Sequence, residues 1–309
     1  MRFITLITSI FIGLSACTPL PGLTKQQPRP KNLTSPGPSV ESQKVANYYA
    51  SVQARLRARG RLRQELSPSD ARFTTQDLIT NFERVALFDE YSERGGKFIE
   101  RQTPSSLRRW ERPVRIALHF GPSTSKEQRA ADTAYVRNFA TRLARLSGLD
   151  IQLTDAKRAN FSLLFLNKDE QRDYISELVG QVKYLIPKIS NEIKNSPRGI
   201  FCVAYAVSDS NSLAGYKGVI ILIKGEHRGL MRESCIHEEM TQALGLANDS
   251  PDARPSIFND DEEFALLTRH DELLLKMLYD PRLKIGMTIK EAHPIVQQIA
   301  QELMALGRS

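Results

Sequence analysis

The chain has 309 residues, of which 41% are hydrophobic and 25% are charged. This ordinary globular composition excludes collagen-like, wholly disordered and multispanning membrane proteins. The formal net charge is +8 at pH 7, and the whole excess lies in residues 1–112, where 18 Lys and Arg stand against 10 Asp and Glu. Residues 113–309 hold 25 of each sign, but 233–280 carry 12 acids and only 3 bases, so we expect an acidic surface there.

The N-terminal segment resembles the signal of a bacterial lipoprotein. Arg2 provides a positive charge, residues 4–14 form an apolar run too short to span a bilayer, and Leu14-Ser15-Ala16-Cys17 is a lipobox. The resemblance implies that a signal peptide, residues 1–16, is removed and that Cys17 carries a diacylglycerol and a palmitate-type acyl chain, which anchor it to a membrane. An ordinary secretory signal or a lone transmembrane helix is the alternative. Because Thr18 is not acidic, the resemblance favours the periplasmic face of the outer membrane over the inner membrane.

Residues 17–40 are expected to form an extended tether, since they are rich in proline and lack apolar periodicity. Helices are expected at 41–66 and 75–91, within a basic helical annex that covers 41–112. Arginines at every second position between 55 and 63 spread around the first helix, so we expect a solvated face, with contact to anionic lipid or glycan as the alternative. Nucleic acid is not an expected partner, because no recognition motif accompanies the charge.

The body, residues 113–309, is expected to be α+β, with the sheet preceding the most informative helix. Alternating or continuous apolar residues predict strands at 113–120, 149–153, 161–166, 200–207 and 217–224. Helical spacing and capping residues predict helices at 125–147, 167–189, 230–246, 268–279 and 288–304.

Two cysteines, Cys202 and Cys235, remain if Cys17 is lipidated. An even pair in an oxidising compartment predicts a disulfide. Closing a loop of 33 residues would stabilise the fold by roughly 3 to 4 kcal/mol in the chain-entropy description. Two buried free thiols are the alternative, whereas a metal site is disfavoured because no Cys or His stands at ligand spacing.

The residues from Glu233 to Asp249 resemble the active-site helix of the metzincin zinc proteases. In that family the motif HExxHxxGxxH supplies three histidines that bind zinc, a glutamate that activates water and a glycine that allows a sharp turn. An alignment that starts at His237 fails, because Thr241 and Leu244 stand where the second histidine and the glycine belong. The other register starts from the run Ala-Leu-Gly-Leu and places Gly245 at the glycine of the motif.

In the register set by Gly245, the resemblance makes Glu239 the water-activating glutamate and Asp249 the aspartate that often follows the motif. The positions of the three zinc-binding histidines are then taken by Glu238, Gln242 and Asn248. Carboxylate and amide oxygens hold zinc less well than imidazole nitrogen, so we expect no zinc and no other cofactor. A hard cation such as Ca²⁺ is the alternative, with Asp260 and Asp261 as further oxygen donors.

The resemblance continues downstream of this helix. Residues 256–258 (Ser-Ile-Phe) fall where metzincins have a Ser-x-Met turn beneath the metal, and 267–279 resembles the helix that closes the same domain. The resemblance covers residues 113 to about 285. It implies a zincin-like mixed sheet of about five strands, an active-site-type helix and C-terminal helices. The body also resembles a family of bacterial lipoproteins of unknown function that share the signatures ExxQALGLxND and SIFNDD.

Three uses of this region remain open. The favoured one is a degenerate zincin-like domain that binds a periplasmic protein or a cell-wall component. A hydrolase that acts on cell-wall glycan or peptide through Glu239 without zinc is the alternative, and a purely structural role for the acids is the third. His237, Asp249 and His270 are further candidates for binding, although a hydrogen-bonded structural role is the expected one for His237. His227 is expected at the surface.

Overall fold

The computed structural model describes residues 37–94, 97–209, 212–259 and 261–306, which belong to one compact unit. The expected signal peptide, the lipidation site Cys17 and nearly all of the expected tether lie outside the described residues. No helix in the described part of the chain is long and apolar enough to cross a membrane.

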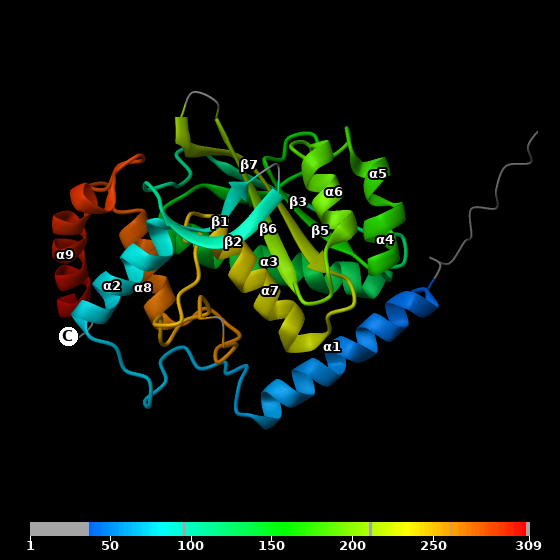
Figure 1. The fold of residues 1–309 in the computed structure, drawn as a ribbon, viewed down its shortest axis with the longest axis horizontal. Coiled ribbons are helices and arrows are strands. Elements are labelled where there is room, and N and C mark those ends of the chain that lie inside the picture. The colour runs from blue at the N-terminus through cyan, green and yellow to red at the C-terminus, as the bar shows by residue number, and fades with distance from the viewer. Residues whose placement is uncertain (1–36, 95–96, 210–211, 260, 307–309) are drawn as a thin grey trace, which may run out of the picture. The chain divides into compact units, whose positions relative to one another are not determined.

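A mixed sheet of five strands in the order β4-β3-β5-β7-β6 organises the molecule (Figure 1). Its strands are β3 (Val114–Phe120), β4 (Ile151–Leu153), β5 (Phe161–Leu166), β6 (Cys202–Asp209) and β7 (Ser212–Lys224). The first four in spatial order are parallel to one another, and β6 is antiparallel to β7 and forms one edge. All six residues of β5 are buried, as a central parallel strand covered on both faces requires. The expected mixed sheet is confirmed.

Helices cover both faces of the sheet, so the architecture is mixed α/β. The helices that follow β3 and β7 are α3 (Lys126–Ser147) and α7 (Gly229–Gln242). They pack on one face with Phe161, Leu163 and Phe165. The other face, with Leu164 and Leu166, is covered by α4 (Lys168–Asp173), α5 (Ile175–Leu178) and α6 (Pro187–Asn195).

The prediction of a single helix at 167–189 is wrong, because the chain forms three short helices between β5 and β6. Gly180 and Tyr184 both adopt positive φ, which interrupts helical geometry. Pro187 then begins α6 at a position that has no need of an N–H donor. The expected pair Asn167 and Glu170 does start α4, since the Asn167 N–H donates to Glu170 Oε2 at 2.8 Å.

The N-terminal part contains α1 (Val40–Ala58), α2 (Thr75–Ala86), β1 (Phe88–Arg94) and β2 (Lys97–Pro104). The expectation of a helical annex needs correction, because the second helix ends at Ala86 and an antiparallel hairpin, β1–β2, follows it. Leu78, Phe82 and Trp110 are fully buried in the same hydrophobic core as β3 and β5. Helix α2 and the segment before β3 therefore share one hydrophobic core with the body.

The C-terminal helices are α8 (Arg269–Leu278) and α9 (Ile289–Leu306), and both contact α2. The expected boundaries of α8 are confirmed because Thr268 and Asp271 form a capping box at its start. Ser125 likewise begins α3, and Gly148 ends it in a left-handed conformation.

Candidate functional site

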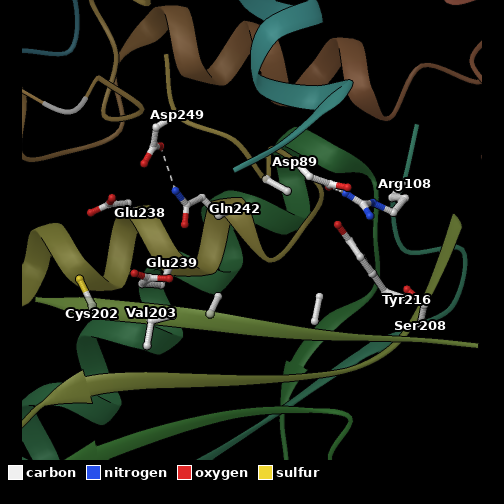
Figure 2. A pocket seen from close by; sticks show the side chains of 13 residues that line it. Asp89, Arg108, Cys202, Val203, Ser208, Tyr216, Glu238, Glu239, Gln242 and Asp249 are labelled. Carbon is white, nitrogen blue, oxygen red and sulfur yellow. Dashed lines mark hydrogen bonds and ion pairs between the residues drawn. The ribbon is translucent and has the colours of Figure 1, made fainter. Parts of the chain in front are cut away.

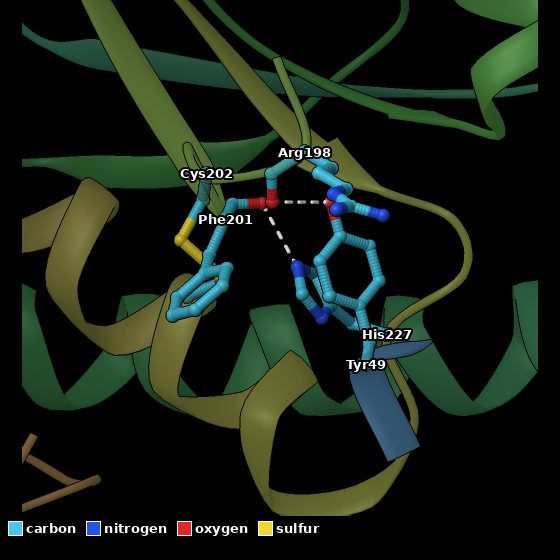
Figure 3. The surroundings of a disulfide bond; sticks show 6 residues. Tyr49, Arg198, Phe201, Cys202 and His227 are labelled. Carbon is cyan, nitrogen blue, oxygen red and sulfur yellow. Dashed lines mark hydrogen bonds between the residues drawn. A yellow bond between two sulfur atoms is a disulfide. The ribbon is translucent and has the colours of Figure 1, made fainter. Parts of the chain in front are cut away.

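Helix α7 and edge strand β6 are joined covalently. Cys202 of β6 and Cys235 of α7 form a disulfide with a Cα–Cα distance of 5.8 Å, which confirms the predicted pairing. Figure 3 shows that Phe201, beside Cys202, accepts a hydrogen bond through its carbonyl oxygen from the buried His227 ring at 2.9 Å. His227 is only 1% exposed, so its expected surface position is wrong.

A groove runs between α7 and β6. It consists of two adjoining cavities, of about 250 Å³ and about 530 Å³, that share Cys202, Glu238, Glu239 and Asp249 in their walls. Figure 2 shows Glu238, Glu239 and Gln242 on α7 facing this space, with β6 running below them. Residues 238 and 242 are one helical turn apart, so they fall on the same face of α7.

Three carboxylates meet in the groove. Glu239 is 4% exposed, while Glu238 and Asp249 are half-buried. Gln242 donates from Nε2 to Asp249 Oδ1 at 3.0 Å, and Gln102 of β2 donates to the Asp249 carbonyl oxygen at 2.7 Å. The hairpin thus holds the loop after α7 in place.

Ion pairs stand at both ends of the groove. Asp89 pairs with Arg108 beside the smaller cavity, and Asp261, on the wall of the larger cavity, pairs with Arg61. In each pair the opposite charges offset one another. The acids on α7 and on the loop that follows it line the same groove.

The C-terminal end of α7 is fixed by contacts from the segment before β3 and from the end of α8. Trp110 Nε1 donates to the Ala243 carbonyl oxygen at 2.8 Å, and Tyr279 Oη donates to the Leu244 carbonyl oxygen at 2.8 Å. Gly245 has φ of 124° and passes so close to the Arg108 carbonyl oxygen that a Cβ would lie 2.2 Å from it. Only glycine meets both conditions, which gives the glycine singled out in the sequence its physical reason.

The Ser256–Phe258 turn is held by a buried carboxylate. Asp271 accepts from Ser256 Oγ at 2.5 Å and from the Ile257 N–H at 3.2 Å. The same side chain accepts from the Thr268 N–H at 2.9 Å, which starts α8. Phe258 is fully buried, so the turn packs its apolar side chain into the core.

Other residues singled out in the sequence point away from the groove. His237 Nδ1 accepts from the Leu267 N–H at 2.9 Å, and its ring stacks on Phe139 with 3.9 Å between centroids. Asn248 is 0% exposed and donates from Nδ2 to the Arg84 carbonyl oxygen at 2.8 Å. Both side chains have structural partners, so neither lines the cavities.

His270 is also fully buried, with Nε2 3.1 Å from Asn81 Nδ2 and its ring edge-on to Phe73. Asp260 lies outside the described residues. Of the sequence candidates, the structure brings together Glu238, Glu239, Gln242 and Asp249, with Asp261 on the far wall. Within the described ranges, no group of three or more His, Cys, Asp or Glu is arranged to hold a metal ion.

Some residues of the groove come from distant parts of the chain and were not predicted from the sequence. Asp89 lies on β1 of the unpredicted hairpin, while Arg108 precedes β3 and Tyr216 lies on β7. Burial raises the pKa of the Tyr216 hydroxyl, so the tyrosine stays neutral at physiological pH. No motif marks these residues, and only the fold places them beside α7.

Lowering the pH from 7 to 4 is expected to destabilise the fold through His237. Burial, with a smaller effect from Arg142, lowers the pKa of its imidazole to about 3, whereas an unfolded histidine titrates near 6.5. Between these values the unfolded chain binds a proton that the folded chain does not. Stability is therefore fully present above about pH 6.5 and falls by up to about 1.4 kcal/mol per pH unit below it.

Urea unfolding of the full-length chain between pH 7 and pH 4 measures this effect. The comparison is His237→Gln, whose amide oxygen can still accept the Leu267 N–H but does not titrate. The variant should show a shallower dependence on pH, by about one proton. Burial lowers the pKa of His227 to about 4. Because His227 is present in both chains, its contribution to the pH dependence of stability is the same in both and cancels in the comparison. Equal slopes would contradict the assignment of His237.

Comparisons with curated proteins and with solved structures found no match. A family model described as "Protein of unknown function (DUF2927)" matches residues 75–298. The match covers α7 and β6, while α1, which contributes Val52 and Leu56 to the larger cavity, precedes it. The chain therefore belongs to the DUF2927 family.

Proposed function

We propose that the protein is a cell-envelope lipoprotein whose groove between α7 and β6 binds a positively charged periplasmic partner, a protein or a cell-wall component. The observation that carries this proposal is the convergence of Glu238, Glu239 and Asp249 on one groove. Charge complementarity of this kind attracts a basic partner and selects against acidic ones. Attachment through Cys17 to the periplasmic face of the outer membrane belongs to the same proposal and rests on the lipobox.

A degenerate zincin-like scaffold is the second part of the proposal. It is supported by the position of Glu239 on a helix that borders the groove, by the tight passage at Gly245 and by the turn that Asp271 holds ahead of α8. The mixed sheet of five strands is also consistent with it.

The donors in the groove argue against zinc chemistry. In the register set by Gly245, the Gln242 amide is engaged with Asp249, and Asn248 is directed to Arg84 in α2. The remaining candidate, Glu238, offers a carboxylate without the nitrogen or sulfur ligands of a tetrahedral zinc site. Binding fits these side chains better than zinc-dependent hydrolysis.

A hydrolase that uses Glu239 without zinc is the second candidate function. One observation favours it, because a buried carboxylate that lines a cleft is the kind of group that serves as a general base. Incubation of the full-length chain with cell-wall sacculi and with peptides tests it. Product that disappears in Glu239→Gln would replace the binding proposal with this one.

Binding of a fluorescent lysine-rich peptide to the full-length chain tests the main proposal. The double variant Glu238→Gln/Asp249→Asn removes two groove charges and should weaken binding by about tenfold or more at low salt. The matched control Asp252→Asn/Glu177→Gln removes two exposed acids that do not line the groove and should bind as the parent does. Equal weakening in both variants would show only a general effect of net charge and would overturn the proposal.

A further inference from the structure

Three parallel strands, β3, β5 and β7, end side by side at one edge of the sheet. After β3 and β7 the chain turns to the face covered by α3 and α7, but after β5 it turns to the face covered by α4, α5 and α6. Where neighbouring strands continue to opposite faces, a crevice opens outside their carboxyl ends, and open α/β sheets bind ligands there. The strand order therefore predicts a ligand crevice at this edge.

A cavity of about 160 Å³ occupies this crevice. The turn between β3 and α3, Asn167 directly after β5, and Gly225 and Glu226 directly after β7 all contribute to its wall. Helix α1 covers the cavity with Ser42 and Ala46. Gly225 has no room for a side chain, since a Cβ would lie 2.3 Å from Asn167 Oδ1. Segments that are distant in the chain thus close around one small cavity.

Glu226 of the cavity wall has one oxygen without a hydrogen-bond partner. The residue is 2% exposed, and its Oε1 accepts from the Lys168 N–H at 2.5 Å, but Oε2 has no partner among the described residues. The nearby Ser42 hydroxyl donates to Asp169 instead. The ammonium groups of Lys168 and Lys224 donate to main-chain carbonyl oxygens. Because buried acceptors are normally paired, this oxygen calls for a donor from a ligand.

The start of α7 supplies the opposite chemistry. Arg228, the residue before α7, lines the cavity and is exposed, and it places no side-chain cap on the helix. The other arginine of the wall, Arg232, is engaged by the buried Asp132. A guanidinium and the positive end of a helix dipole both favour a carboxylate. The wall therefore presents a hydrogen-bond acceptor at Glu226 and an anion-binding end at Arg228.

We propose that this cavity binds a small α-amino acid as its zwitterion. The ammonium group donates to Glu226 Oε2, and the carboxylate accepts from Arg228 and from the first turn of α7. The site lies at the start of α7, whereas Glu238 and Gln242 of the groove lie near its end. The inference therefore does not depend on the proposed function.

The size of the cavity restricts the amino acid. Its volume of about 160 Å³ is several times the roughly 30 Å³ that one water molecule takes in the liquid, and it lies below the roughly 300 Å³ at which pockets for drug-sized ligands begin. A ligand of a few heavy atoms fits this space. Glycine and alanine meet the requirement, whereas amino acids with long side chains do not.

Calorimetric titration of the full-length chain with alanine tests the inference. Alanine should bind about tenfold or more tightly than ethylamine, which lacks the carboxylate, and than propionate, which lacks the ammonium group. Absence of alanine binding would overturn the inference, and equally tight binding of glycerol would replace the zwitterion with a neutral polyol. The groove variant Glu238→Gln/Asp249→Asn should bind alanine as the parent does. Loss of alanine binding in that variant would overturn the separation of the two sites.

Two variants assign the two ends of the ligand. Arg228→Gln should weaken binding of alanine about tenfold and leave ethylamine unchanged, whereas Glu226→Gln should weaken alanine and leave propionate unchanged. Burial raises the pKa of Glu226, so the fold tolerates a neutral group there and Glu226→Gln should fold as the parent does. Arg137→Gln is the matched control, since Arg137 is exposed on α3 and does not line the cavity. Equal weakening in Arg137→Gln would show only an effect of net charge and would overturn the assignment.

A third variant tests the wall that α1 contributes. Ala46→Leu places a larger side chain in the cavity and should abolish binding of alanine, while leucine keeps a high helix propensity. Ala50→Leu is the matched control, because Ala50 lies one turn further along α1, is exposed and does not line the cavity. It should bind alanine as the parent does. If Ala46→Leu binds alanine as tightly as the parent, the cavity beneath α1 is not the site and the inference is overturned.

Discussion

Replacing Asp132 with Ala is expected to lower the free energy of unfolding by about 3 to 5 kcal/mol. Asp132 of α3 accepts two hydrogen bonds from Arg232 of α7, at 2.8 Å from Nε and 2.6 Å from Nη2. Both residues are buried, at 4% and 5% exposed. Removal of the carboxylate leaves a buried guanidinium without its compensating charge, and that uncompensated charge accounts for the large effect.

Urea unfolding measures this loss, and two further variants interpret it. The double variant Asp132→Leu/Arg232→Met removes both charges and should recover much of the stability, because apolar side chains of similar size can replace a buried ion pair. Asp173→Ala breaks an exposed pair with Arg172 and should cost far less stability than Asp132→Ala. A double variant as unstable as the single one would contradict the explanation from uncompensated charge.

Replacing Gly245 with Ala is expected to destabilise the fold by roughly 4 kcal/mol. Two effects add, since a positive φ of 124° is strained for alanine and the new Cβ would lie 2.2 Å from the Arg108 carbonyl oxygen. Backbone strain of this kind costs about 1 to 3 kcal/mol, and forcing an extra methyl group into packed structure costs a similar amount. The same clash pushes the loop that carries Asp249 away from α7, so binding at the groove should weaken as well.

Gly148→Ala separates the two effects. Gly148 ends α3 with φ of 74°, and a Cβ built there meets nothing within 4 Å. This variant should therefore cost only about 1 kcal/mol, from the left-handed conformation alone. Thermal or urea unfolding compares the two chains. If Gly245→Ala is no less stable than Gly148→Ala, the close passage beside Arg108 does not constrain position 245.

Local signals in the sequence determined the ends of those helices whose capping residues can be recognised in the chain. Ser125 and Gly148 mark the two ends of α3, and Thr268 with Asp271 marks the start of α8. These signals suffice because a cap satisfies backbone groups of the adjacent turn, and that turn is contiguous in the chain. The helix expected at 167–189 failed for the converse reason, since positive φ at Gly180 and Tyr184 is visible only in the folded chain.

The sequence also determined part of the site. Glu238, Glu239 and Gln242 lie on one helix, so helical geometry alone places 238 and 242 on the same face. Cysteine parity predicted the disulfide that joins α7 to β6. The directions of His237, Asn248 and His270 were decided by tertiary packing, because each makes a buried contact with a residue that is distant in the chain.

Only the tertiary structure decided what faces α7 across the groove. Asp89 comes from the β1–β2 hairpin, at a position where helical spacing in the sequence predicted a helix. Arg108 and Tyr216 reach the groove from elements far from α7 in the chain. The crevice at the carboxyl ends of β3, β5 and β7 likewise follows from strand order, which depends on how all five strands pair. Helix periodicity and caps operate over a few residues and can be read locally. Strand order and buried polar contacts join residues distant in the chain, and their stability depends on the whole core.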